Sequence, residues 1–140
     1  MNAYMNQYQN NQILTAPPEQ VLIMLYDGAI RFVRQARLAI EQKDVPARTR
    51  AISKAVAIIT EFSNTLDYEI GGEIAIDLGR LYDFMVRELA AVNARGDAEK
   101  LTPVENILVE LREAWVEAAK IYASEKQAAV KSSGSIAAAL

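Results

Sequence analysis

The side chains that could carry chemistry in this sequence are carboxylates repeated at helical spacing. Two such series occur: Glu69, Glu73 and Asp77, and Glu110, Glu113 and Glu117. Residues three or four apart share one face of a helix, and inward-facing carboxylates hold the metal ions of di-iron helical bundles. Those sites also take a Glu-x-x-His motif from two of their helices, and the chain contains no histidine. We therefore interpret both series as solvated helix faces and expect no metal site.

Other catalytic arrangements are missing for the same reason. A serine nucleophile needs a neighbouring base, and haem bundles usually take histidine as an axial ligand. The chain has no cysteine, which excludes thiolate chemistry and disulfides. It also has no glycine-rich loop of the Walker type, which argues against nucleotide hydrolysis. The sequence thus predicts a protein that is not an enzyme and uses no cofactor.

The composition is that of a folded globular domain. Hydrophobic residues make up 51% and charged residues 24% of the 140 positions, which suits one domain with a sizeable core. The net charge of -3 argues against nucleic-acid binding, because phosphate neutralisation supplies much of that affinity. The stretch from Met1 to Gln12 has no charged residue, unlike a signal peptide, and the longest apolar run, Val21 to Tyr26, is too short to cross a bilayer. These features predict a soluble, cytoplasmic protein without membrane insertion.

Four segments show the three- and four-residue recurrence of apolar side chains that is typical of amphipathic helices. Turn-forming residues separate them: Pro17-Pro18 before the first, Lys43-Asp44 after it, Gly71-Gly72 after the second and Gly96-Asp97 after the third. Pro46 is expected in the first turn of the second helix. No stretch alternates with a period of two, so we expect no strands. Four helices joined by short loops predict an all-α fold, an antiparallel four-helix bundle.

The chain is expected to consist of a flexible N-terminal arm (1–16), the helical bundle domain (17–123) and a frayed C-terminal tail (124–140). The fourth helix should begin with a capping box, in which Thr102 is the N-cap and Glu105 is the third helical residue. Ser132-Ser133-Gly134 should break the helix if it reaches that far.

Two glycines, Gly28 and Gly79, lie inside predicted helices, where each costs up to about 1 kcal/mol relative to alanine. They either are a penalty that the fold tolerates or mark a close contact that a side chain would block. We favour the close contact.

The tripeptide Leu-Tyr-Asp occurs at 25–27 and again at 81–83. In both places an arginine, Arg31 or Arg87, follows the aspartate by four residues, so the two side chains share a helix face and could pair. The repeat is either the trace of a duplicated hairpin or a coincidence.

The first and third helices carry more apolar side chains than one core stripe requires. Candidate partner-binding residues are Ile23, Tyr26 and Ile30 on the first helix, Ile76, Tyr82, Phe84 and Val86 on the third, and Tyr8, Ile13 and Leu14 in the arm. A helix at the centre of a bundle is apolar all round, whereas the same pattern on an open face forms a groove that binds peptides. The pattern leaves both interpretations open. The apolar residues of the arm slightly favour a groove, which the arm could cover when no partner is bound.

Several blocks of the sequence resemble one known family. They are TAPPEQ at 15–20, MLYDGAIRF at 24–32, LDYEIGGEIA at 66–75, LYDFMVR at 81–87 and LREAW at 111–115. In order and spacing they resemble the flagellar secretion chaperones (FliS), from about Tyr8 to Tyr122. The chain departs from the family at Pro17, where a serine or threonine usually caps the first helix, so that hydrogen bond should be lost or pass to Thr15. The tail beyond Ser124 has no counterpart in the family.

The resemblance implies a helical bundle that binds the C-terminal segment of flagellin, which is disordered in the monomer and helical in the filament. It also implies that the chaperone prevents premature polymerisation and delivers flagellin to the flagellar type III export apparatus, without nucleotide or metal. The export gate and other flagellar regulators are possible further partners, and the chain is expected to be a monomer or weak dimer. The alternative is a structural bundle that self-associates without cargo.

Overall fold

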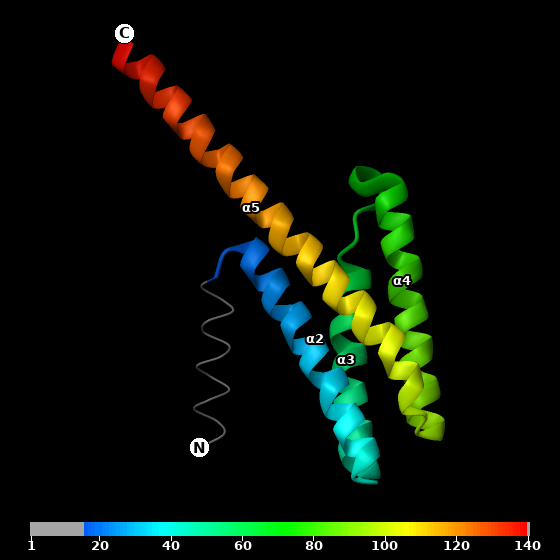
Figure 1. Ribbon diagram of the computed structural model, residues 1–140. Helices are drawn as coiled ribbons and strands as arrows, with labels where there is room; N and C mark the ends of the chain where they lie inside the picture. Colours follow the sequence, from blue (N-terminus) through cyan, green and yellow to red (C-terminus); the bar gives the residue numbers. More distant parts are fainter. Residues whose placement is uncertain (1–15, 140) are drawn as a thin grey trace.

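The computed structural model describes residues 16–139, with side chains up to Lys131, and folds them into a bundle of four long helices (Figure 1). The elements are α2 (Pro18–Glu41), α3 (Val45–Asn64), α4 (Tyr68–Arg95), the short 3-10 turn η1 (Ala98–Lys100) and α5 (Leu101–Ala139). Successive helices run in opposite directions, and α2 packs against both α3 and α5 while α4 packs against α3 and α5. Between residues 16 and 139 there is no strand. The predicted all-α antiparallel bundle is confirmed, and the predicted arm lies almost wholly outside the described residues.

The turns between helices mostly follow the local signals of the sequence. Asp44 caps α3 by accepting a hydrogen bond from the backbone N–H of Ala47 at 3.1 Å, and Pro46 lies in the first turn as predicted. Gly96 ends α4 in the left-handed conformation, with φ of 72°, which glycine adopts without steric cost. At the start of α2, Pro17 is the N-cap residue and provides no side-chain hydrogen bond, as expected for a proline. Thr15 lies outside the described residues.

The boundary between α3 and α4 differs from the prediction, which placed it at Gly71-Gly72. Helix α3 ends at Asn64, and α4 begins at Tyr68 because the Asp67 carboxylate accepts a hydrogen bond from the Ile70 N–H at 3.0 Å. The two glycines therefore lie within α4. Gly72 has φ of 53° and ψ of -126°, a conformation open to glycine, and it bends the first turn of α4 away from the rest of the helix. Figure 1 shows this bent turn at one end of α4.

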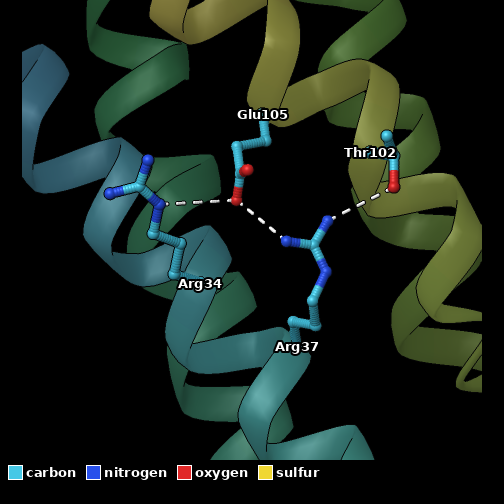
Figure 2. A network of polar contacts seen from close by, with 4 residues as sticks. All are labelled: Arg34, Arg37, Thr102 and Glu105. Atoms are coloured by element: carbon cyan, nitrogen blue, oxygen red, sulfur yellow. Dashed lines mark hydrogen bonds and ion pairs between the residues drawn. The ribbon is translucent and has the colours of Figure 1, made fainter.

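The predicted capping box at the start of α5 is wrong. The turn η1 leads directly into Leu101, and Asp97 caps it by accepting from the Glu99 N–H at 3.2 Å, so Thr102 already lies inside the helix. Glu105 instead accepts a hydrogen bond from Arg37 of α2 at 2.9 Å, as Figure 2 shows. Arg37 also donates to the Thr102 hydroxyl at 3.3 Å. These side chains join α5 to α2.

We expect Glu105→Gln to lower the free energy of unfolding by about 1 kcal/mol, because the substitution removes the charge of a largely buried carboxylate that pairs with Arg37. Urea denaturation at low salt measures the change. The matched control is Asp77→Asn, whose partner Arg80 lies 3.7 Å away with both side chains more than two-thirds exposed. An equal loss of stability in both variants would contradict the assignment.

The predicted end of the last helix is also wrong, because α5 continues through Ser132-Ser133-Gly134 to Ala139. Once a helix is formed, each added residue gains a backbone hydrogen bond, and a serine or glycine costs no more than about 1 kcal/mol relative to alanine. From Lys120 to Lys131 every residue is exposed. Helix α5 thus extends well beyond the other helices, as Figure 1 shows.

The two helical glycines have different environments. A Cβ atom on Gly79 would lie 3.0 Å from the Tyr68 hydroxyl and 3.6 Å from Cδ1 of Leu66, which confirms a close contact. The contacting residues belong to the start of α4 and the linker before it. A Cβ atom on Gly28 would make only an ordinary contact, 3.4 Å from Cδ1 of Ile58, so the close-contact prediction holds at Gly79 alone.

The predicted aspartate–arginine pairs within the repeated tripeptide do not form. Asp27 pairs with Arg112 of α5, and Arg31 lies over the Phe32 ring, 5.2 Å from its centroid. Arg87 donates to the backbone carbonyl of Asp83 at 3.4 Å and not to its carboxylate. Tertiary neighbours outcompete the pair within the helix because such a pair contributes only a few tenths of a kcal/mol.

Candidate partner-binding surface

Large apolar side chains are exposed at the start of α4. Ile70 is 87% exposed and Ile74 is 71% exposed, and Tyr68 and Ile76 are about half exposed. Ile70 and Ile74, which we call the α4 patch, lie together at the N-terminal end of α4, whereas Ile76 is two residues beyond Ile74 and points to another face of the helix. Exposed apolar clusters of this kind mark surfaces that bind other proteins.

A hollow of about 290 Å³ adjoins the α4 patch, where the ends of several helices meet. We call it the seam groove, and its apolar lining consists of Leu22 from α2, Phe62 from α3, Leu66 from the linker, Ile70, Ile74, Ala75, Leu78 and Tyr82 from α4, and Trp115 from α5. Ile70 and Ile74 belong to both the patch and the groove. Together the two features offer an apolar docking surface with contributions from every helix.

A second hollow, of about 440 Å³, lies along the contact between α3 and α4. Its lining is more polar and includes Asn64 from α3 and Val86 and Arg87 from α4. Tyr82 lines both hollows, but the other lining residues of the two hollows lie on different faces of α3 and α4.

The bent first turn of α4 shapes one wall of the seam groove. The Asp67 cap and the Gly72 conformation bend the start of α4. In this bent conformation the hydroxyl of Tyr68 lies against Gly79, further along the same helix. Leu66 contacts the same glycine. The packing on Gly79 thus holds the bend that exposes Ile70.

Beneath the groove, three aromatic rings form the core of this end of the bundle. Phe62 stacks on Tyr26 with ring centroids 4.3 Å apart and lies 5.7 Å from the Tyr82 ring. The hydroxyls of Tyr26 and Tyr82, from the two copies of the repeated tripeptide, form a hydrogen bond of 2.8 Å. Burial raises the pKa of both tyrosines above the ordinary value of 10.0, and the bond between the hydroxyls raises that of Tyr82 further.

This arrangement predicts a loss of stability in alkali. Above pH 10 each tyrosine releases its proton in the unfolded chain but keeps it in the folded chain, so the free energy of unfolding falls by up to about 1.4 kcal/mol per pH unit for each. Below pH 10 the contribution is complete. Urea denaturation between pH 8 and 11 measures the slope, and Tyr26→Phe with Tyr82→Phe should flatten it. If the double variant loses stability with pH as steeply as the parent does, groups other than these tyrosines cause the loss.

The residues predicted from the sequence to bind a partner occupy three kinds of position. Tyr26 is fully buried, and Ile30 and Tyr82 are no more than 6% exposed, so the structure places these three residues in the core and corrects their expected exposure. Each packs against the facing helices; Ile30 also reaches a hollow between α2 and α5, and Tyr82 lines both the seam groove and the second hollow. Tyr8, Ile13 and Leu14 lie outside the described residues.

The other predicted residues remain candidates. Ile23, Phe84 and Val86 are half-buried, and Phe84 and Val86 pack against the core with one side. Ile76 is exposed on another face of α4. Val86 lines the second hollow, between α3 and α4.

The main surface residues were missed by the pattern of the sequence. The predicted boundary at Gly71-Gly72 puts Tyr68 and Ile70 near the end of the second helix and separates them from Ile74. The sequence signal that would have identified them is the Gly71-Gly72 pair preceded by Asp67, which combines a helix cap with a bend five residues later. Leu22 and Trp115 join the site only through the packing of α2 and α5.

Neither a metal site nor a membrane span is found in the described part of the chain. Residues 16–131 contain no group of three or more acidic side chains placed to hold a metal ion. None of the helices with described residues combines the length and apolar character that crossing a bilayer requires.

The family model described as flagellar protein FliS matches residues 1–122. This chain belongs to the FliS family. The resemblance seen in the sequence is thereby confirmed. The match ends at Tyr122, whereas α5 continues to Ala139.

Relatives from several bacteria carry the name flagellar secretion chaperone FliS. The protein of Salmonella typhimurium is 42% identical over 116 residues, covering 82% of this chain and 86% of the relative. The protein of Bacillus subtilis is 37% identical over 111 residues, covering 79% and 82% of the two chains. A crystal structure of a flagellar chaperone from bacteria matches with a TM-score of 0.69, covering 83% of this chain and 97% of the other, and at 18% identity it supports the fold alone.

Proposed function

We propose that this FliS-family chain binds the C-terminal segment of flagellin in the cytoplasm, prevents its premature polymerisation and delivers it to the flagellar type III export apparatus. The observation that carries the proposal is the α4 patch, where Ile70 and Ile74 are exposed beside an apolar groove. Flagellin segments that pack together in a filament must bury apolar faces, and such a face can pack on this surface instead. The family name of the relatives agrees with this role.

The energetics require a long binding surface. Ordering about 30 residues costs roughly 30 kcal/mol of backbone entropy at ~1 kcal/mol each. At ~25 cal/mol per Å², roughly 1,200 Å² of apolar burial offsets that cost. The seam groove alone is too small, so the segment should also pack on further apolar surface of the bundle. We therefore expect the free energy of binding to be distributed over many contacts.

The test is calorimetric titration with a peptide of the flagellin C-terminal segment. Replacing Ile70 and Ile74 together by aspartate should weaken binding roughly tenfold, because it removes two apolar contacts and places charge on the surface. Both side chains are mostly exposed, so the thermal unfolding temperature should hardly change.

The matched control is Val130→Asp, which changes an apolar side chain that is 67% exposed on the extension of α5. It should bind the peptide as the parent does. Light scattering on the same samples distinguishes the alternative, since a monomer that forms a one-to-one complex supports the chaperone. A dimer that ignores the peptide and dissociates when Ile70 and Ile74 are changed would support a self-associating structural bundle.

A further inference from the structure

A third hollow, of about 530 Å³, lies between α2 and α5 and shares no residue with the α4 patch or the seam groove. In Figure 1, α2 and α4 lie on either side of α5. We call this hollow the arginine groove, because Arg31 and Arg34 from α2 and Arg112 from α5 line it. Its apolar lining includes Leu38 and Val109.

The positive charge of this groove is only partly neutralised. Its lining has three arginines and one carboxylate, Asp27, which gives a net charge of +2 in a chain whose total is -3. Asp27 pairs with Arg112. Arg34 reaches Glu105 only at 3.6 Å, while Arg37 holds the same oxygen at 2.9 Å. Arg31 has no ion pair with any residue of the described part of the chain.

The lining residues of the groove from α2 follow the axis of that helix. Asp27, Arg31, Arg34 and Leu38 follow one another at steps of four, three and four, so they form a straight stripe along α2 of about 16 Å. Helix α5 forms the opposite wall. Leu38 is half exposed at one end of the stripe and provides an apolar contact beside the guanidinium groups. A simple anion would use only a small part of this stripe.

We propose that the arginine groove binds an acidic amphipathic helix of a partner protein distinct from the cargo. Carboxylates spaced by one helical turn match the spacing of Arg31 and Arg34, and the planar guanidinium group can donate two parallel hydrogen bonds to each carboxylate. An apolar side chain on the same face of the partner helix packs on Leu38 and Val109. The chain then holds cargo and a second protein on different sides of the bundle.

The test uses a fluorescent helical peptide of about 14 residues, four turns long, with glutamates one turn apart beside leucines. Fluorescence anisotropy should show saturable binding to the full chain. The variant Arg31→Gln with Arg34→Gln should bind roughly tenfold more weakly, because two charge-assisted contacts are lost. The matched control, Arg80→Gln with Arg95→Gln, removes the same charge from exposed positions of α4 and should leave binding unchanged.

Charge reversal sharpens the test. The double variant Arg31→Glu with Arg34→Glu should no longer bind the glutamate peptide. It should instead bind a peptide of the same sequence in which lysines replace the glutamates. Circular dichroism confirms that each variant is folded. The proposal is overturned if both double-glutamine variants weaken binding equally, or if a peptide with glutamine in place of glutamate binds as well. It is also overturned if the flagellin peptide displaces the probe. None of these results affects the test of flagellin binding.

Discussion

Replacing Phe62 by alanine is expected to lower the free energy of unfolding by about 4 kcal/mol. The ring is 4% exposed and stacks on Tyr26 at 4.3 Å, so its removal leaves a cavity that the rigid rings around it cannot fill. Tyr82, at 5.7 Å, loses its neighbour as well. Urea denaturation followed by far-UV circular dichroism measures the change.

The matched control is Phe32→Ala. Phe32 is half-buried, and its ring makes two cation–π contacts. The Arg31 guanidinium lies 5.2 Å and the Lys54 ammonium 5.5 Å from the ring centroid. Its removal should cost only about 1 kcal/mol, because solvent already reaches the ring and no closed cavity forms. If the two alanine variants lose equal stability, the aromatic cluster is not the centre of this core.

The second large effect is expected for Gly72→Ala, which should lower the free energy of unfolding by about 2 kcal/mol. At φ of 53° and ψ of -126° a Cβ atom clashes with the local backbone, although no other atom lies within 4 Å of its position. The strain can be relieved only by straightening the first turn of α4. That change moves Ile70 and withdraws Tyr68 from Gly79, so flagellin-peptide binding should weaken together with stability.

Gly28→Ala is the control, because Gly28 is helical and its Cβ atom would make an ordinary contact with Ile58. It should be neutral or stabilising by up to about 1 kcal/mol, as alanine favours the helix. Thermal unfolding and peptide titration of both variants distinguish the effect of losing the bend from the general effect of adding a methyl group. Normal peptide binding by Gly72→Ala would show that the bend does not position the α4 patch.

The fold could be predicted from the sequence because its signals are local. The recurrence of apolar residues defines four helices, and turn residues such as Lys43-Asp44, Pro46 and Gly96 behave alike in any context. The Gly71-Gly72 pair was ambiguous, since glycine permits either a helix end or a bend. The bend at Gly72 is accompanied by the packing of Tyr68 on Gly79, a contact that no local pattern contains.

The site was less predictable because helical periodicity does not say how far a neighbouring helix covers a face. Tyr26 and Ile70 are both apolar residues on helices, yet one is fully buried and the other is 87% exposed. The same limit applies to Glu105. Its spacing from Thr102 fits a capping box, but the approach of Arg37 from α2 directs its carboxylate to another helix. Only the arrangement of helices decides between these possibilities.

Helix α5 is one continuous helix of 39 residues, roughly 58 Å long, but the bundle supports only its first part. Leu101, Val104 and Leu108 are fully buried, whereas no residue from Lys120 to Lys131 is. Amide protons near Leu108 should therefore exchange with deuterium only when the whole domain opens, while those beyond Lys120 exchange through local fraying of a marginal helix. A protease should cut this latter part first and release a trimmed domain that still melts as a single unit.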